Sequence, residues 1–174
     1  LTGVSNRRGL YDALARDVAA AGRTKAPLSL AMMDIDHFKR INDEHGHQAG
    51  DRALTHFAQV IKSGIRAMDS LCRYGGEEFV VVMPDTDGAF AMSVAERLRR
   101  SVEAAPFTIS RAPGTLNVTV SIGIATCADE ALDYDAMFLI ADKRLYQAKA
   151  AGRNCVIGTR VVSTDNPVRL AVHG

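Results

Sequence analysis

The chain has almost no excess of charge of either sign. Its 174 residues carry 21 Lys and Arg against 20 Asp and Glu, a formal net charge of +1 at pH 7. Binding to nucleic acid or to an anionic membrane usually needs a strongly basic surface, so the composition indicates no nucleic acid partner. Apolar runs of the roughly 20 residues that cross a bilayer are absent, and no signal peptide is recognisable. We therefore expect a cytoplasmic protein, although upstream segments of a longer protein could attach it to a membrane.

Cysteine is scarce and irregularly placed. The three cysteines, Cys72, Cys127 and Cys155, are an odd number at wide spacing without a Cys-x-x-Cys pair. This pattern favours reduced, mostly buried thiols over a disulfide framework or a zinc site. Internal repeats and low-complexity tracts are also lacking. With 47% hydrophobic and 24% charged residues, the composition is typical of one soluble globular domain with a substantial core.

Hydrophobic periodicity predicts how the elements follow one another. Helical spacing of apolar residues occurs over 6–23, 37–45, 51–68, 89–102 and 136–150. Asn6 is the expected N-cap of the first helix, and the fourth carries Phe90, Val94, Leu98 and Val102 at helical spacing. Apolar or alternating runs predict strands over 28–33, 71–83, 107–109, 116–124 and 154–157.

The order of these elements indicates the fold class. A hairpin in mid-chain requires antiparallel pairing, which argues against a doubly wound parallel sheet. The order β-α-α-β-β-α-β-α-β fits an α+β fold of the ferredoxin-like, split βαβ type, with a central, mostly antiparallel sheet flanked by helices. We expect one domain over residues 1–160 and a loose tail over residues 161–174, which show no packing pattern. The chain opens without Met inside a motif, so we expect a fragment whose upstream regulatory domain is missing.

The most informative segment is Arg73-Tyr74-Gly75-Gly76-Glu77-Glu78-Phe79, which leads into the apolar run 80–83. Two glycines between short β-prone segments predict a hairpin, because a two-residue turn that matches strand twist needs a positive φ, which glycine adopts without steric cost. Such a turn would expose Glu77 and Glu78 at its tip. A metal ion or a polyphosphate could reach them there.

A second carboxylate lies at the end of the first strand. In a split βαβ sheet this strand can lie beside the hairpin, so Asp34 could meet Glu77. Hard cations such as Mg²⁺ prefer oxygen ligands, and two carboxylates with the Ile35 carbonyl would suit one. The alternative is that Asp34 merely ends a strand and Glu77 is a solvated turn residue. Asp36 could touch a second ion, but the role of N-cap to the following helix is preferred.

The strand-to-helix turn after Asp36 is a candidate phosphate site. The N-terminus of a helix presents free backbone N–H groups to an anion, and Lys39 lies in the first turn, where acids are usually favoured. A nearby phosphate would explain this lysine, although it could also be an ordinary surface residue. Beyond it, Asn42 and Asp51 could recognise guanine, because Asp can accept from the guanine N1–H and N2 amino groups that adenine lacks. His45-x-His47 is a weak transition-metal pattern without an obvious third ligand.

Four segments together resemble the GGDEF domain of diguanylate cyclases, and the resemblance extends from Leu1 to about Ile157. Gly75-Gly76-Glu77-Glu78-Phe79 is similar to the signature itself, in the variant with Glu at the third position. The opening residues 1–8, the segment around Asn42 and the segment 141–154 are similar to the start of the family, to its guanine-binding segment and to its C-terminal motif. The resemblance implies the fold of nucleotidyl cyclases and polymerase palm domains.

The resemblance also implies the roles of individual residues. Two Mg²⁺ or Mn²⁺ ions per active half-site would be held by Asp34, the Ile35 carbonyl and Glu77. Glu77 and Lys39 would be catalytic. The implied GTP-binding residues are His37, Phe38, Lys39, Asn42, His47, Asp51, Glu78, Lys149 and Arg153. Lys149 and Arg153 would bind the terminal phosphates, although two cations at a helix end could also simply complement the helix dipole.

An Arg-x-x-Asp sequence, Arg66 to Asp69, stands where the family carries its product-inhibition motif. Arginine can clamp phosphates or stack on guanine, and Asp can accept from guanine. Arg97 fits the secondary position of this inhibitory cyclic di-GMP site. The alternative is an ordinary i, i+3 surface ion pair.

The function implied is condensation of two GTP into cyclic di-GMP and two pyrophosphates across an antiparallel homodimer, with feedback inhibition by the product. An upstream sensor or receiver domain would control the geometry of the dimer. The first alternative is a catalytically silent receptor for GTP or cyclic di-GMP. A different nucleotidyl cyclase or polymerase-like transferase on the same fold is the second alternative, and competition by ATP would distinguish it.

Overall fold

A computed structural model describes residues 1–110, 114–127 and 134–158 of the chain. Its centre is a five-stranded sheet in the order β2-β3-β1-β6-β7. The strands of this sheet are β1 (Leu28–Ile35), β2 (Ser70–Arg73), β3 (Glu78–Pro84), β6 (Val120–Cys127) and β7 (Val156–Ile157). A separate two-stranded ribbon consists of β4 (Phe107–Thr108) and β5 (Thr115–Leu116).

β1 lies in the middle of the sheet because it is apolar over nearly its whole length, and every one of its residues is buried. It pairs antiparallel with β3 on one side and with β6 on the other, while β7 pairs parallel with β6. The hairpin of β2 and β3 therefore lies beside the first strand. The predicted α+β fold with a mostly antiparallel sheet is confirmed.

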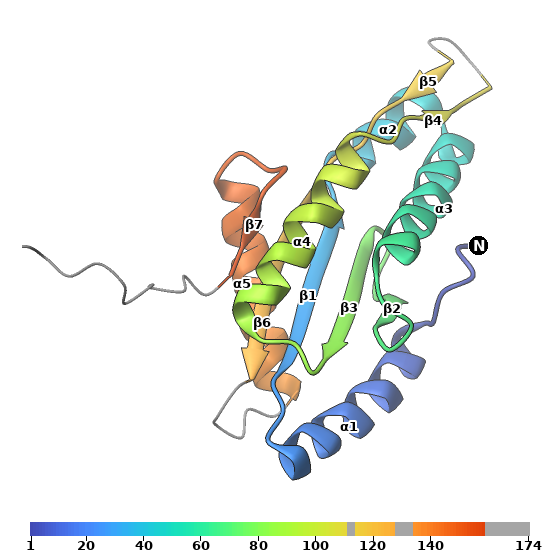
Figure 1. The fold of residues 1–174 in the computed structure, drawn as a ribbon. Helices are drawn as coiled ribbons and strands as arrows, with labels where there is room; N and C mark the ends of the chain where they lie inside the picture. Colours follow the sequence, from blue (N-terminus) through green and yellow to red (C-terminus); the bar gives the residue numbers. More distant parts are fainter. Residues whose placement is uncertain (111–113, 128–133, 159–174) are drawn as a thin grey trace, which may run out of the picture.

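Helices cover both faces of this sheet (Figure 1). They are α1 (Arg7–Thr24), α2 (Phe38–His45), α3 (His47–Gly64), α4 (Gly88–Glu103) and α5 (Tyr134–Ala150). α3 and α4 pack on one face and α1 and α5 on the other, because alternate residues of β1 point to opposite faces. Met33, for example, joins the cluster beneath α3 and α4, and Met32 joins the one beneath α1 and α5. The Asn6 side chain accepts a hydrogen bond from the Gly9 N–H, which confirms the predicted N-cap of α1.

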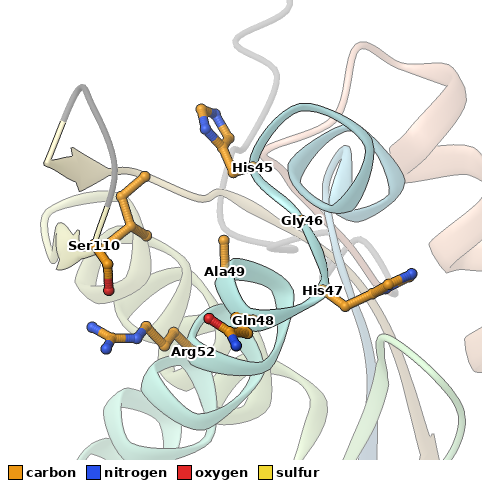
Figure 2. Close-up of a pocket in the computed structure, with 8 residues that line it drawn as sticks. His45, Gly46, His47, Gln48, Ala49, Arg52 and Ser110 are labelled. Atoms are coloured by element: carbon orange, nitrogen blue, oxygen red, sulfur yellow. The ribbon is translucent and has the colours of Figure 1, made fainter.

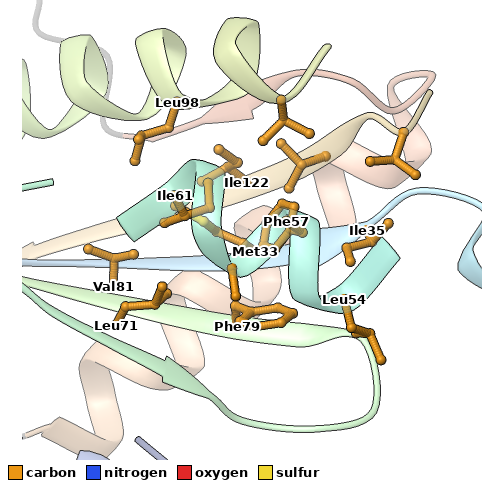
Figure 3. Packing of buried hydrophobic residues seen from close by; sticks show 14 of the residues in the cluster. Met33, Ile35, Leu54, Phe57, Ile61, Leu71, Phe79, Val81, Leu98 and Ile122 are labelled. Carbon is orange, nitrogen blue, oxygen red and sulfur yellow. The ribbon is translucent and has the colours of Figure 1, made fainter. Parts of the chain in front are cut away.

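Aromatic packing joins α3 to the hairpin inside the larger cluster (Figure 3). The rings of Phe57 and Phe79 are both fully buried, and their centroids lie 4.8 Å apart. Truncating a buried Phe to Ala typically costs about 3–5 kcal/mol, so this contact holds α3 firmly over the sheet. None of the helices within the described residues is long and apolar enough to span a membrane.

Three local predictions differ from the structure. The second long helix was expected over 51–68, but α3 begins at His47, because Gly46 with φ of 83° turns the chain directly into it. α3 ends at Gly64, before a turn in which the Asp69 carboxylate accepts from the Arg66 backbone N–H. The strand expected over 116–124 is divided into β5 and β6, although Val118 and Val120 remain buried as the alternation predicts.

The third difference concerns α4. Val94, Leu98 and Val102 are buried as expected, but Phe90 is 50% exposed. It lies in the first turn of the helix, beyond the edge of the core, where the Arg66 guanidinium is placed over its ring. The tail of residues 161–174 lies outside the described residues.

Candidate active site

The hairpin loop of residues 74–77 differs from the predicted glycine turn. Neither Gly75 nor Gly76 adopts a positive φ. Instead, the Arg73 guanidinium donates to the Gly76 carbonyl at 2.7 Å, and the Tyr74 N–H donates to the Glu78 carbonyl at 2.8 Å. A Cβ added to Gly75 would collide with the Glu78 side chain, whereas one added to Gly76 would meet nothing within 4 Å. Gly75 therefore lies against the end of the Glu78 side chain, and Gly76 leaves the surface beside the acids open.

The loop brings Glu77 to the end of β1. Asp34 and Glu78 are partners in the β1–β3 register, and the Ile35 N–H donates to the Glu77 carbonyl at 3.3 Å. Burial raises the pKa of Asp34. Burial, followed by the negative charge of Asp34, raises the pKa of Glu77. The two carboxylates therefore interact unfavourably while both are ionised, and a cation between them would relieve this repulsion.

α5 supplies the positive charge at this end of the sheet. Lys149 Nζ lies 2.7 Å from Asp34 Oδ2, and the lysine side chain remains 34% exposed. The positive charge of Arg153 also lowers the pKa of Asp34, against the larger effect of burial. Sequence reasoning placed Lys149 at phosphates, but it did not foresee that this lysine pairs with a predicted metal ligand.

Asp36 is not an N-cap, so that prediction was wrong. The N-cap residue of α2 is His37, which has a φ of 57° and no capping side-chain hydrogen bond. The buried carboxylate of Asp36 instead accepts from the Thr119 and Ser121 hydroxyls, each at 2.7 Å, and from the Asn154 N–H at 3.0 Å. The polar face of the strand predicted over 116–124 was the available signal for this anchor. Asp36 thereby fastens the end of β1 to β6 and to the segment after α5.

The predicted phosphate turn begins directly after this anchor. His37 and Lys39 are exposed, and Phe38 is buried beneath them. The first N–H groups of a helix have no partner within the helix, so the start of α2 can donate to an anion. Lys39 places an exposed positive charge in the same turn.

The predicted guanine residues lie on α2 and α3. A Cβ added to Gly50 would collide with the Asn42 side chain, so the two helices pack closely there. A cavity of about 270 Å³ is lined by His47 as well as by His45, Arg52 and other residues, but in Figure 2 the His47 side chain points away from the others. Asp51 lines a neighbouring hollow, and Asn42 lines neither of these two. Neither is lined by Asp34, Glu77 or Lys149, so these hollows do not mark the acidic pair.

The acidic pair suits a divalent metal that takes part of its ligands from phosphate and water, and not one held by protein ligands alone. Among the described residues, no three His, Cys, Asp or Glu side chains come together as a metal cluster. Mg²⁺ usually binds through one or two carboxylates and takes its remaining ligands from phosphates and water. Asp34 and Glu77, beside the backbone of Ile35, supply donors of that kind.

The Arg-x-x-Asp segment lies at the opposite end of β1, where Leu28 pairs with Pro84. Arg66 Nη2 donates to Asp69 Oδ1 at 2.8 Å, and the Asp69 side chain is only 2% exposed. The same nitrogen also donates to the Pro84 carbonyl and the Thr86 hydroxyl. Arg97 Nη2 donates to the Gly64 carbonyl at 2.9 Å, so the structure brings all three predicted inhibitory residues to the same end of α3. The i, i+3 ion pair is therefore present, and the acid in it is buried.

Comparisons with known proteins identify the family and support the fold. The family model for the diguanylate cyclase GGDEF domain matches residues 1–155. The chain is similar to the response regulator PleD of Caulobacter vibrioides, with 48% identity over 161 residues, covering 91% of this chain and 35% of that protein. It thus spans about a third of the length of this relative.

Two solved structures are also similar. The GGDEF domain of DgcB from Caulobacter crescentus in complex with c-di-GMP has a TM-score of 0.85 and 33% identity, covering 90% of this chain and 89% of that chain. The active GGEEF domain of a diguanylate cyclase from Vibrio cholerae has a TM-score of 0.82 and 34% identity, covering 90% of this chain and 98% of that chain.

Proposed function

Because the chain belongs to the GGDEF domain family of diguanylate cyclases, we propose that it condenses two GTP into cyclic di-GMP and two pyrophosphates. The observation that carries this proposal is the meeting of Asp34 from β1, Glu77 from the hairpin and Lys149 from α5 at one end of the sheet. Two acids with raised pKa values beside a lysine suit a reaction that needs both a metal and a bound triphosphate.

The acidic pair would hold the metal. Asp34, Glu77 and the Ile35 carbonyl are the proposed ligands of Mg²⁺ or Mn²⁺, with two ions per half-site. These ions would polarise the α-phosphate and neutralise the charge that develops during the displacement. Lys149, which lies 2.7 Å from Asp34, and Arg153 would bind the terminal phosphates beside this metal site.

Glu77 is the proposed proton acceptor for the attacking 3′-hydroxyl. The hairpin places this carboxylate beside Asp34, where the reacting groups would meet, and a carboxylate within reach of the hydroxyl can act as a general base. Lys39 would stabilise charge on the reacting phosphate, with the backbone N–H groups around His37 and Phe38 as further donors. Glu78, the register partner of Asp34, adds a third carboxylate at this end of the sheet and is a further proposed GTP-binding residue.

Recognition of guanine is assigned to Asn42 and Asp51, with His47 at the border of the nucleotide. A site that accepts from guanine N1–H and N2 leaves its acceptors unpaired when adenine binds, so ATP should compete weakly. At the opposite end of β1, Arg66, Asp69 and Arg97 would bind cyclic di-GMP as the inhibitory product.

The reaction requires a second copy of the domain. Each copy holds one GTP, and the 3′-hydroxyl of one GTP must reach the α-phosphate of the other. Two copies must therefore meet antiparallel, and the orientation of the dimer controls the rate. We propose that an upstream sensor or receiver domain in the longer protein sets this orientation.

The test is turnover of GTP with Mg²⁺ after pre-bound nucleotide has been stripped from the protein, with products separated by chromatography. Cyclic di-GMP should form faster than linearly with protein concentration and should be lost in Glu77→Gln. Glu44→Gln is the matched control, since Glu44 is an exposed acid on α2 outside the acidic pair. If no product forms even after dimerisation is forced through a fused coiled coil, the result contradicts the cyclase proposal and favours a receptor for GTP or cyclic di-GMP.

A further inference from the structure

The segment between α5 and β7 has an unusual backbone. Gly152, Arg153 and Asn154 follow one another with φ values of 111°, 67° and 47°. Residues other than glycine rarely adopt this region, and they stay there only where the surroundings hold them. Asn tolerates the conformation better than Arg does. Arg153, the proposed phosphate ligand, is therefore held by its surroundings in an intrinsically unfavourable backbone conformation.

Asn154 makes the contacts that hold this turn. Its backbone N–H donates to the buried carboxylate of Asp36 at 3.0 Å. Its side-chain Oδ1 accepts from Arg99 Nη1 at 2.7 Å, and its Nδ2 donates to Glu103 Oε1 at 2.8 Å. The Asn154 backbone thus joins the turn to Asp36, directly after β1, and the Asn154 side chain joins it to α4.

The α4 side of this contact is itself rigid. The Arg99 side chain is 11% exposed and is paired with Glu96 at 2.9 Å and with Glu103 at 2.8 Å. A guanidinium held between two carboxylates keeps its direction, so it can fix the amide it contacts. The next residue, Arg100, is 72% exposed and binds only Glu96 within this group, away from Asn154.

We propose that Asn154, clamped by Arg99 and Glu103, is a positioning residue that holds Arg153 toward the terminal phosphates of the nucleotide. The inference rests on the proposed function, because it takes Arg153 as a phosphate ligand. Without the clamp the turn can relax toward negative φ and carry the Arg153 guanidinium away from Asp34. The loss of affinity should then concern the contacts to the phosphates of the nucleotide and not the contacts to its guanine base.

The test compares two ligands on the whole 174-residue chain. Calorimetry with Mg²⁺ measures the Kd of a GTP analogue that cannot be hydrolysed at the α-phosphate and the Kd of GMP. Asn154→Gly keeps the positive φ and the backbone N–H but removes both side-chain bonds. This variant should raise the Kd of the triphosphate analogue at least about fivefold and the Kd of GMP less than about twofold, since only the triphosphate reaches Arg153.

Arg99→Met removes the Arg99 half of the clamp and keeps the amino-acid sequence of residues 152–154, so it also serves if Asn154→Gly fails to fold. It should show the same split between the two ligands, and the double variant should be no worse than Asn154→Gly, because that variant already lacks the bond to Arg99. Arg100→Met is the control and should bind both ligands like the parent chain.

Two outcomes would overturn the proposal in different ways. Parent-like triphosphate binding by Asn154→Gly and Arg99→Met, or an equal loss of both ligands, refutes the positioning role alone. A parent chain that binds neither ligand refutes the proposed function as well.

Discussion

The two ends of β1 each carry a buried aspartate beside a cation, yet they differ in how far that aspartate is neutralised. At one end, burial raises the pKa of Asp34 even though Lys149 lies 2.7 Å away, and Glu77 adds a second carboxylate. At the other end, Asp69 accepts from both the backbone and the guanidinium of Arg66, and its hydrogen bond raises the pKa of that arginine. At the first end, Asp34 and Glu77 share the positive charge of Lys149, whereas at the second end the Arg66 guanidinium is hydrogen-bonded to the single carboxylate of Asp69.

This difference determines which kind of ligand each end would gain from. The Asp34 end has an acid in excess, so it gains from a metal ion. The Asp69 end has Arg66 and Arg97 against one buried acid, so it gains from an anion, but a ligand there must compete with bonds that already stabilise the turn. Under the proposed function, the same residue types would therefore serve ligands of opposite charge at the two ends of one strand.

The largest expected effect is at the acidic end, where activity and stability should change in opposite directions. Glu77→Gln should lower cyclic di-GMP formation about a thousandfold. The same variant should slightly raise the thermal unfolding midpoint in EDTA, because a neutral amide removes the repulsion with Asp34. Calorimetry against Glu44→Gln measures this rise. A midpoint several degrees below that of the parent would mean that Glu77 supports the fold.

At the other end, one substitution should weaken both the fold and the inhibition. Arg66→Ala leaves Asp69 buried without its partner and should cost about 2 kcal/mol, or about 4–8 °C in unfolding midpoint. Arg97→Ala removes a single bond from an exposed side chain and should cost less than about 0.5 kcal/mol. Both should raise the cyclic di-GMP concentration for half-inhibition about tenfold or more. Equal stability of the two variants would contradict the difference drawn between the ends.

The smallest effect concerns α4, which touches both ends through Arg97 and Arg99. Arg99 lowers the pKa of Glu96 and of Glu103 below the ordinary 4.5. Acids with a lowered folded pKa contribute stability that is present above pH 4.5 and is lost as the pH falls through the folded value. Arg99→Met should therefore lower the unfolding midpoint by about 2 °C at pH 7 and by less at pH 3. A constant difference across this range would show that Arg99 acts through packing alone.

Local patterns were sufficient for most of the fold. The alternation over residues 116–124 and the apolar run of β1 predicted which faces are buried, and the mid-chain hairpin implied that Asp34 and Glu77 could meet. The role of Asp36 escaped prediction, because its partners Thr119, Ser121 and Asn154 lie more than eighty residues away in the chain. The loop at Gly75 and Gly76 was mispredicted for a different reason: its partners are local, but the side chains of Arg73 and Glu78 shape it, which the glycine pattern alone does not show.

The sequence by itself determined the elements, the family resemblance and the identity of the candidate residues, because these follow from short-range periodicity and from the order of motifs. Only the tertiary structure decided which charges are neutralised. Lys149 reaches Asp34 because α5 packs on β1 and β6, and Asp69 is satisfied because α3 ends in a turn against Pro84 and Thr86. Burial and the distance between charges set the pKa of an acid, and both are properties of the packed chain that no stretch of sequence contains.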